Sequence, residues 1–249
     1  MRSLRRHFLR NNILIAKHLI GLKKPAGVFL FCMALNLGIG QTNKKLTICF
    51  DPVFGKNTPV IMDSVYFMDD KNTVKFETLK FYISNIQLFN NSELVWREKK
   101  SFHLCGTDSS NKNIYLNIPV SKEFTRLTFN LGIDSITNVS GALGGDLDPT
   151  KGMYWTWQSG YVNFKLEGKS EKSKDPKKEF QFHLGGYSGL NKAVQTITLN
   201  CVYKKKIGID IDLKQFINST DLAKQHHVMS PGEAAVILSQ LAAKCFSTQ

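Results

Sequence analysis

The chain has 249 residues, with 33 Lys or Arg against 20 Asp or Glu, and a formal net charge of +13. This length allows one large domain or two small ones. The basic residues form short, scattered groups without interleaved aromatic residues, which argues against a nucleic-acid-binding surface. We interpret these groups as solvated strand edges and turns.

Residues 1–40 have the pattern of a secretory signal peptide. Residues 1–25 contain seven Lys or Arg and no acidic residue, and an apolar run over 26–39 follows. We expect cleavage near Gly40–Gln41, which leaves a net charge of +6 and a protein exported to the periplasm or cell surface. The run is shorter than the ~20 residues of a transmembrane helix, so no transmembrane span is expected after cleavage; a retained anchor is the alternative.

Residues 41–249 predict an all-β fold in a single domain. Strict alternation places Leu46, Ile48 and Phe50 on one face of the first strand. Many short strands separated by turn signals are typical of an antiparallel β-sandwich or a barrel. The expected strands are residues 44–54, 61–69, 74–90, 96–105, 113–118, 124–133, 161–167, 179–184, 194–203 and 206–213.

The C-terminal region predicts a short helix over Met229–Phe246. Ser230 is the expected N-cap, Pro231 takes the first helical position, and Glu233 completes a capping-box spacing. A second, shorter helix is expected near Asp212–Ile217.

Four cysteines remain after the predicted cleavage. An exported protein meets an oxidising compartment, and four cysteines allow three pairings that the sequence does not distinguish. The absence of a C-x-x-C pair argues against a thiolate metal cluster. The four are Cys49, Cys105, Cys201 and Cys245.

The segment Asp148–Gly168 contains two of the three tryptophans, Trp155 and Trp157. The even positions of the strand that begins at residue 161 are apolar and are expected to face the core. The same alternation, followed backwards, places Met153 and both tryptophans on the solvent side.

Two arrangements remain open for this segment. A bulge at Ser159-Gly160 would turn the tryptophans towards the core. Without a bulge they would form an exposed aromatic patch that needs a partner.

The strand over residues 179–184 is expected to pair antiparallel with residues 161–167. This pairing would bring His183 to the end where the tryptophans arrive, and Gly185-Gly186 would allow a close approach. Histidine is the commonest nitrogen ligand of metals, and the Met153 thioether suits Cu(I). Intact tryptophan is a poor ligand, but oxidation to kynurenine would provide an aniline nitrogen with a free lone pair.

Several motifs resemble the MbnP-like family over about residues 45–246. They are "LKFYISNIQL", "FHLCGTDSS", "LDPTKGMYWTWQSGYVNFKLEG", "FHLGGY" and "HHVMSPG". The family consists of methanobactin-associated exported copper-binding proteins. The resemblance implies a β-sandwich that binds one copper ion beside histidines and a kynurenine, and a MauG-like di-haem peroxidase as the modifying partner.

The resemblance also implies the copper ligands. The histidine of "FHLGG" is His183, and either Trp155 or Trp157 is the residue to be modified. Some relatives have kynurenine-x-His where this chain has Trp155-Thr156-Trp157, so a second histidine is absent or comes from elsewhere. The candidates for it are His103, His226 and His227.

The sequence therefore predicts an exported, non-catalytic protein that binds copper, as Cu(I) or Cu(II), for acquisition or buffering. The alternative is a metal-free cell-surface module that binds a protein or glycan through exposed aromatic residues. Asp146 and Asp148 are interpreted as turn formers rather than catalytic acids, and the catalytic motifs of common hydrolases are absent from the sequence.

Overall fold

The computed structural model describes residues 42–56, 58–107, 112–119, 123–157 and 160–249. The predicted signal peptide, Ser159 of the predicted bulge, and the predicted turn at Asp108-Ser109 lie outside these ranges. Gln41–Gln249 form one compact unit. No helix in the described ranges is long and apolar enough to cross a membrane.

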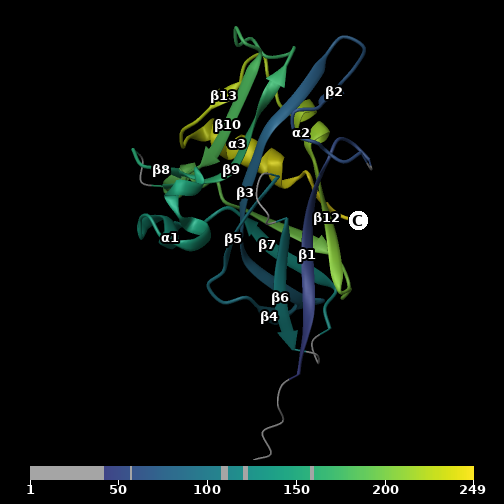
Figure 1. The fold of residues 1–249 in the computed structure, drawn as a ribbon. Helices are drawn as coiled ribbons and strands as arrows, with labels where there is room; N and C mark the ends of the chain where they lie inside the picture. The colour runs from purple at the N-terminus through teal and green to yellow at the C-terminus, as the bar shows by residue number, and fades with distance from the viewer. Residues whose placement is uncertain (1–41, 57, 108–111, 120–122, 158–159) are drawn as a thin grey trace, which may run out of the picture. The chain divides into compact units, whose positions relative to one another are not determined.

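The described strands form two main sheets (Figure 1). The four-stranded sheet has the order β14-β12-β1-β6, with bounds Phe246–Thr248, Lys206–Asp212, Asn43–Val53 and Asn113–Pro119. The larger sheet has the order β11-β7-β3-β9-β10-β13, with bounds Gln195–Asn200, Arg126–Leu131, Thr73–Asn90, Gly160–Ser170, Glu179–Gly185 and His227–Val228. The strands off this path are β2 (Val65–Phe67), β4 (Glu93–Arg97) and β5 (Phe102–Gly106) on β3, and β8 (Tyr154–Trp155) on β9.

The inner faces of the two sheets pack on a shared core, which confirms the all-β sandwich. Ile48 of β1, Phe81 of β3 and Phe182 of β10 are almost fully buried in it. The alternation of apolar and polar residues along the strands explains this, because every second side chain points to the same face. Not every pairing is antiparallel: β1 pairs with β12, and β10 with β13, in parallel.

Helices make a smaller contribution. The predicted short helix is α2 (Leu213–Ser219), which the Asp212 side chain caps by accepting a hydrogen bond from the Gln215 amide. The remaining helical segments are α1 (Ser135–Val139), α3 (Glu233–Ala243) and the 3-10 turns η1 (Gly145–Leu147), η2 (Pro149–Lys151) and η3 (Gly189–Asn191).

The C-terminal helix is confirmed as α3, but its predicted ends are wrong. The helix begins at Glu233, and Gly232 rather than Ser230 occupies the N-cap. Pro231 precedes the helix because this part of the chain lies against β10, where the Pro231 side chain approaches Gly186. Phe246 belongs to β14 instead of the helix.

A second, smaller hydrophobic cluster lies apart from the main core. Its members are Tyr82, Leu104, Ile133, Leu147, Met153, Trp155, Tyr161 and Val162. Met153 and Trp155 are therefore off the main core, as the alternation predicts, but their predicted exposure to solvent is wrong. Residues from β5, η1 and the loop after β7 cover them, and strand alternation cannot reveal such a cover.

One irregularity of the large sheet lies at Asn163 of β9, whereas the predicted bulge at Ser159-Gly160 is partly outside the described residues. In the β9–β10 ladder, Leu184 pairs with Phe164 and Gly185 pairs with Val162, which leaves Asn163 unpaired. The side-chain oxygen of Asn163 accepts a hydrogen bond from the Ile133 amide at 2.9 Å. The extra residue shifts the side-chain alternation of β9.

Candidate metal centre

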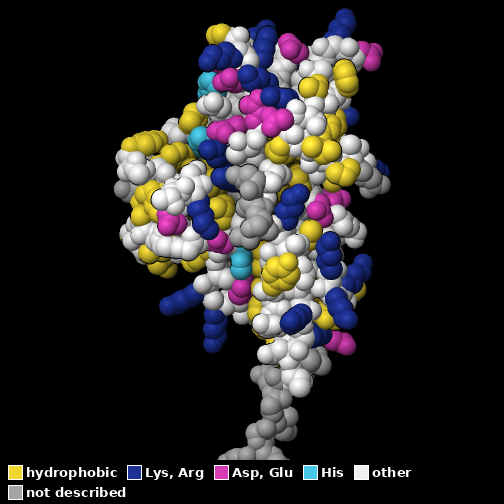
Figure 2. Space-filling model, viewed as in Figure 1, with side chains coloured by type: hydrophobic (Ala, Val, Ile, Leu, Met, Phe, Trp, Pro, Cys, Tyr) yellow, Lys and Arg dark blue, Asp and Glu magenta, His cyan; other side chains and the backbone are white. Residues whose placement is uncertain are grey.

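The outer face of the large sheet carries the charged side chains of the candidate site. Figure 2 shows acidic, basic and histidine side chains gathered over β3, β9 and β10. Lys165, Glu167 and Lys169 alternate along β9, and His183 pairs across the ladder with Lys165. This face is polar because the opposite faces of the same strands form the main core.

His183 is held by a carboxylate on the neighbouring strand. Its Nε2 lies 2.6 Å from Glu167 Oε1, and the two side chains are 12% and 23% exposed. The hydrogen bond with His183, a second one with Thr78, and the Lys165 ammonium lower the pKa of Glu167 to about 2. The carboxylate is therefore ionised at neutral pH and can only accept, so the proton of this bond belongs to His183 Nε2.

The side-chain hydrogen bond of His183 within the described residues is made by Nε2, and Nδ1 takes no part in it. In the neutral imidazole with hydrogen on Nε2, the lone pair of Nδ1 is available to a metal. A carboxylate that orients the ring in this way is typical of metal-binding histidines. The chemistry of His183 and Glu167 therefore fits a metal ligand and its supporting partner.

The Trp155 ring packs against β10, the strand that carries His183. Tyr154 and Trp155 of β8 pair with Tyr161 and Gly160 of β9. A Cβ atom on Gly185 would lie only 2.7 Å from Cζ3 of the Trp155 ring, so the indole rests on the bare Gly185 backbone.

Gly185 comes two residues after His183, on the same face of β10. The hairpin prediction, which brings the tryptophan segment to the His183 end, is confirmed for Trp155.

The two tryptophans have different environments. Trp155 is 7% exposed and Trp157 is 64% exposed, and their ring centroids lie 6.0 Å apart. Met153, which was predicted to contribute a thioether, is fully buried in the smaller cluster. Trp157 is therefore the solvent-accessible member of this group.

The remaining predicted histidines lie in two different parts of the fold. His103 is on β5, which pairs with β3, and its Nε2 lies 3.0 Å from Glu98 Oε2. His226 immediately precedes β13, and its ring centroid is 5.0 Å from that of His227. Since β13 pairs with β10, the structure brings the His226 segment, and not His103, alongside the strand of His183.

The described parts of the chain contain no group of three His, Cys, Asp or Glu side chains that could hold a metal ion. The four cysteines among the described residues have no disulfide partner. Burial raises the pKa of each thiol, to about 11 for Cys201 and about 12 for Cys245, and also for Cys49 and Cys105. These thiols are neutral at physiological pH, so they are poor metal ligands.

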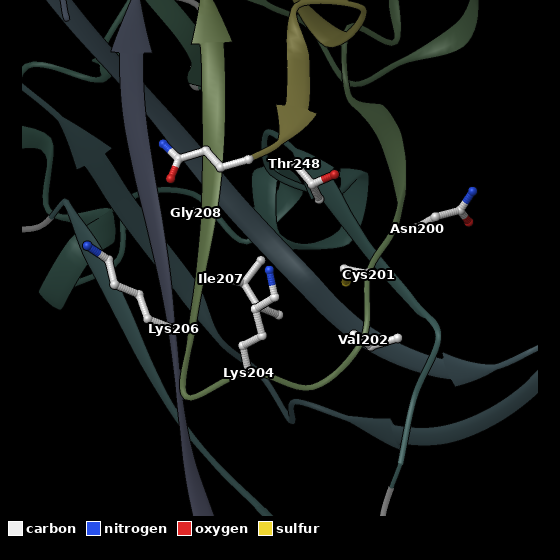
Figure 3. A pocket seen from close by; sticks show the side chains of 9 residues that line it. Asn200, Cys201, Val202, Lys204, Lys206, Ile207, Gly208 and Thr248 are labelled. Carbon is white, nitrogen blue, oxygen red and sulfur yellow. The ribbon is translucent and has the colours of Figure 1, made fainter. Parts of the chain in front are cut away.

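The cavity shown in Figure 3 is separate from this face. It has a volume of about 360 Å³ and is lined by Cys201, Lys204 and Ile207, among others, near the β11–β12 connection and β14. None of the predicted ligands lines it. A smaller cavity of about 250 Å³ includes His103 and Asp146.

A family model described as MbnP matches residues 43–230. The chain belongs to the MbnP family. A search of solved structures finds MbnP from Methylosinus trichosporium, with a TM-score of 0.59 and 13% identity over 79% of this chain and 88% of that chain. At this identity the likeness establishes the shared fold. No curated protein matches the sequence.

Sequence reasoning missed Glu167 as the partner of His183. The alternation in "VNFKLEG" already placed Glu167 on the outer face, together with Lys165. Finding the contact also requires the register of β9 against β10, in which Glu167 is diagonal to His183. That register is set at the hairpin end, where the Ser170 amide donates to the Lys178 carbonyl, and the alternation within one strand does not specify it.

Proposed function

We propose that this MbnP family member is an exported, non-catalytic copper-binding protein that acts in copper acquisition or buffering. The observation that carries the proposal is the His183–Glu167 pair, with Trp155 seated on the same strand face at Gly185. Copper is bound well by imidazole, and Cu(I) also accepts softer ligands. The predicted signal peptide would deliver the protein to the periplasm or cell surface.

Trp155 is the proposed site of oxidation to kynurenine. Its indole lies near His183 along β10, whereas Trp157 extends into solvent. A kynurenine at Trp155 would add an aniline nitrogen to the imidazole of His183. A MauG-like di-haem peroxidase is the proposed modifying partner, and the exposed Trp157 ring is available to contact it.

Copper binding is tested by titrating the purified protein with copper under reducing and oxidising conditions. We expect one copper per chain in the parent protein and loss of most binding in His183→Ala. His103→Ala is the matched control, because it also removes a carboxylate-paired histidine, on β5. Unchanged stoichiometry and affinity in His183→Ala would refute the assignment of this site.

The tryptophan modification is tested by peptide mass spectrometry after co-expression with a di-haem peroxidase of the MauG type. We expect a kynurenine in the peptide over residues 153–165, at Trp155 and not at Trp157. Two intact tryptophans would exclude the modification in this chain.

The metal-free alternative rests on exposed apolar residues. The aromatic one is Trp157, which is 64% exposed, and the aliphatic Ile136 and Val139 of α1 are 82% and 73% exposed. Binding of a glycan or a protein by such a surface would persist in a metal chelator and decrease in Trp157→Ala. Since Trp155 and Met153 are buried, this surface is smaller than the predicted aromatic patch.

A further inference from the structure

The copper site proposed above needs a donor beyond His183 and the modified tryptophan. The described residues contain no group of three His, Cys, Asp or Glu side chains that could hold a metal ion. The edge strand β13 pairs with β10, and it is followed by Met229, whose thioether is a sulfur donor.

The residue that follows β13 is Met229. His227 pairs with Gln181 and Val228 pairs with Phe182, in parallel, and β13 ends at Val228. Continued by one residue, this register points Met229 towards His183 on β10. The chain still follows β10 two residues later, because Pro231 Cβ would lie 3.3 Å from a Cβ atom on Gly186.

Met229 also belongs to the same face as His183. Val228 and Phe182 point inwards and are buried in the main core. Alternation then turns Met229 outwards, in agreement with its 43% exposure. His183 is only 12% exposed although it is on the outer face, so neighbouring side chains must cover it.

We propose that Met229 donates its thioether sulfur to copper bound at His183, which makes the site selective for Cu(I). This inference rests on the proposed copper-binding function. A thioether is a soft ligand that prefers Cu(I), while a carboxylate would favour harder ions. Glu167 is engaged with His183 Nε2, which leaves Nδ1 of the ring for the metal.

Met229 is better suited to this role than Met153. Met153 is fully buried among the apolar side chains of the smaller cluster. An ion that reached it would lose its hydration among apolar side chains, which is costly. Met229 is 43% exposed, so an ion that arrives from solvent can reach this residue.

His227 provides the matched control on the same edge strand. Its Nε2 lies 3.9 Å from Asp175 Oδ2, so its ring is directed towards the β9–β10 loop. His227 is one of the candidate histidines of the sequence, but this pairing takes its ring away from His183, so His227→Ala changes the same edge strand without removing a thioether.

The experiment is a competition titration of the purified protein with Cu(I) and a chromogenic Cu(I) chelator, repeated with Cu(II). Met229→Leu keeps the size and apolar character of the side chain, so folding should be retained. We expect a roughly 10- to 100-fold loss of Cu(I) affinity in Met229→Leu and less than a ~3-fold change for Cu(II). His227→Ala should retain the Cu(I) affinity of the parent within about 3-fold, and copper X-ray absorption should show a sulfur neighbour that Met229→Leu removes.

Three outcomes overturn the inference, and they separate it from the proposed function. If the parent protein binds no copper, both fail. If the parent binds copper through His183 but Met229→Leu binds Cu(I) equally well, only the thioether assignment fails. If His227→Ala loses as much Cu(I) affinity as Met229→Leu, the effect belongs to the edge strand and not to the sulfur of Met229.

Discussion

Replacing Gly185 with alanine is expected to destabilise the protein through a steric conflict under Trp155. The new Cβ atom would lie 2.5 Å from the Tyr161 carbonyl oxygen and 2.7 Å from Trp155 Cζ3. Both distances are far inside van der Waals contact, so the indole and the β9 backbone must move. Overpacking of this kind costs about 1–3 kcal/mol.

An opposing effect reduces this cost. Alanine restricts the unfolded chain more than glycine does, which stabilises the folded state by about 0.4–1 kcal/mol. The steric term is larger, so we expect a net loss of about 1–2 kcal/mol. For a protein of this size, that corresponds to a decrease in Tm of roughly 2–8 °C.

Thermal unfolding followed by circular dichroism measures this difference, with Gly144→Ala as the control. Gly144 has a φ of −92°, and a Cβ atom there would meet nothing within 4 Å. The control should therefore have an unchanged or slightly raised Tm. Equal Tm values for the two variants would refute the close packing of Trp155 on Gly185.

Two further predictions concern protonation and the thiols. The low pKa of Glu167, about 2 against 4.5, contributes stability that is present above about pH 4.5 and lost as the pH falls through 2. With allowance for solvent screening, Glu167→Gln should be less stable than the parent by about 2 kcal/mol at pH 7. Denaturant titrations should show this difference in unfolding free energy closing as the pH falls, and a difference that stays constant would contradict the assignment. A thiol reagent should react slowly with the native protein. In denaturant it should react with all four cysteines of residues 41–249, and a lower count would reveal disulfides among Cys49, Cys105, Cys201 and Cys245.

The candidate site shows how far local sequence patterns reach. The alternation in β9 and β10 predicts two paired strands with His183 on their outer face, and the glycines after His183 predict a close approach. These features are local, because side-chain direction and glycine geometry depend on neighbouring residues alone. The resemblance of the motifs to the MbnP-like family was likewise readable from the sequence, and the family match confirms it.

Only the tertiary structure decided what surrounds these residues. Part of the cover over Met153 and Trp155 comes from Leu104 and Ile133, which are distant in the sequence, and the pairing register of β9 with β10 brings Glu167 diagonal to His183. The parallel pairing of β13 with β10 ends one residue before Met229, which is why we infer a role for Met229 beside His183. Such contacts arise from long-range packing and register, which the alternation of a single strand does not encode.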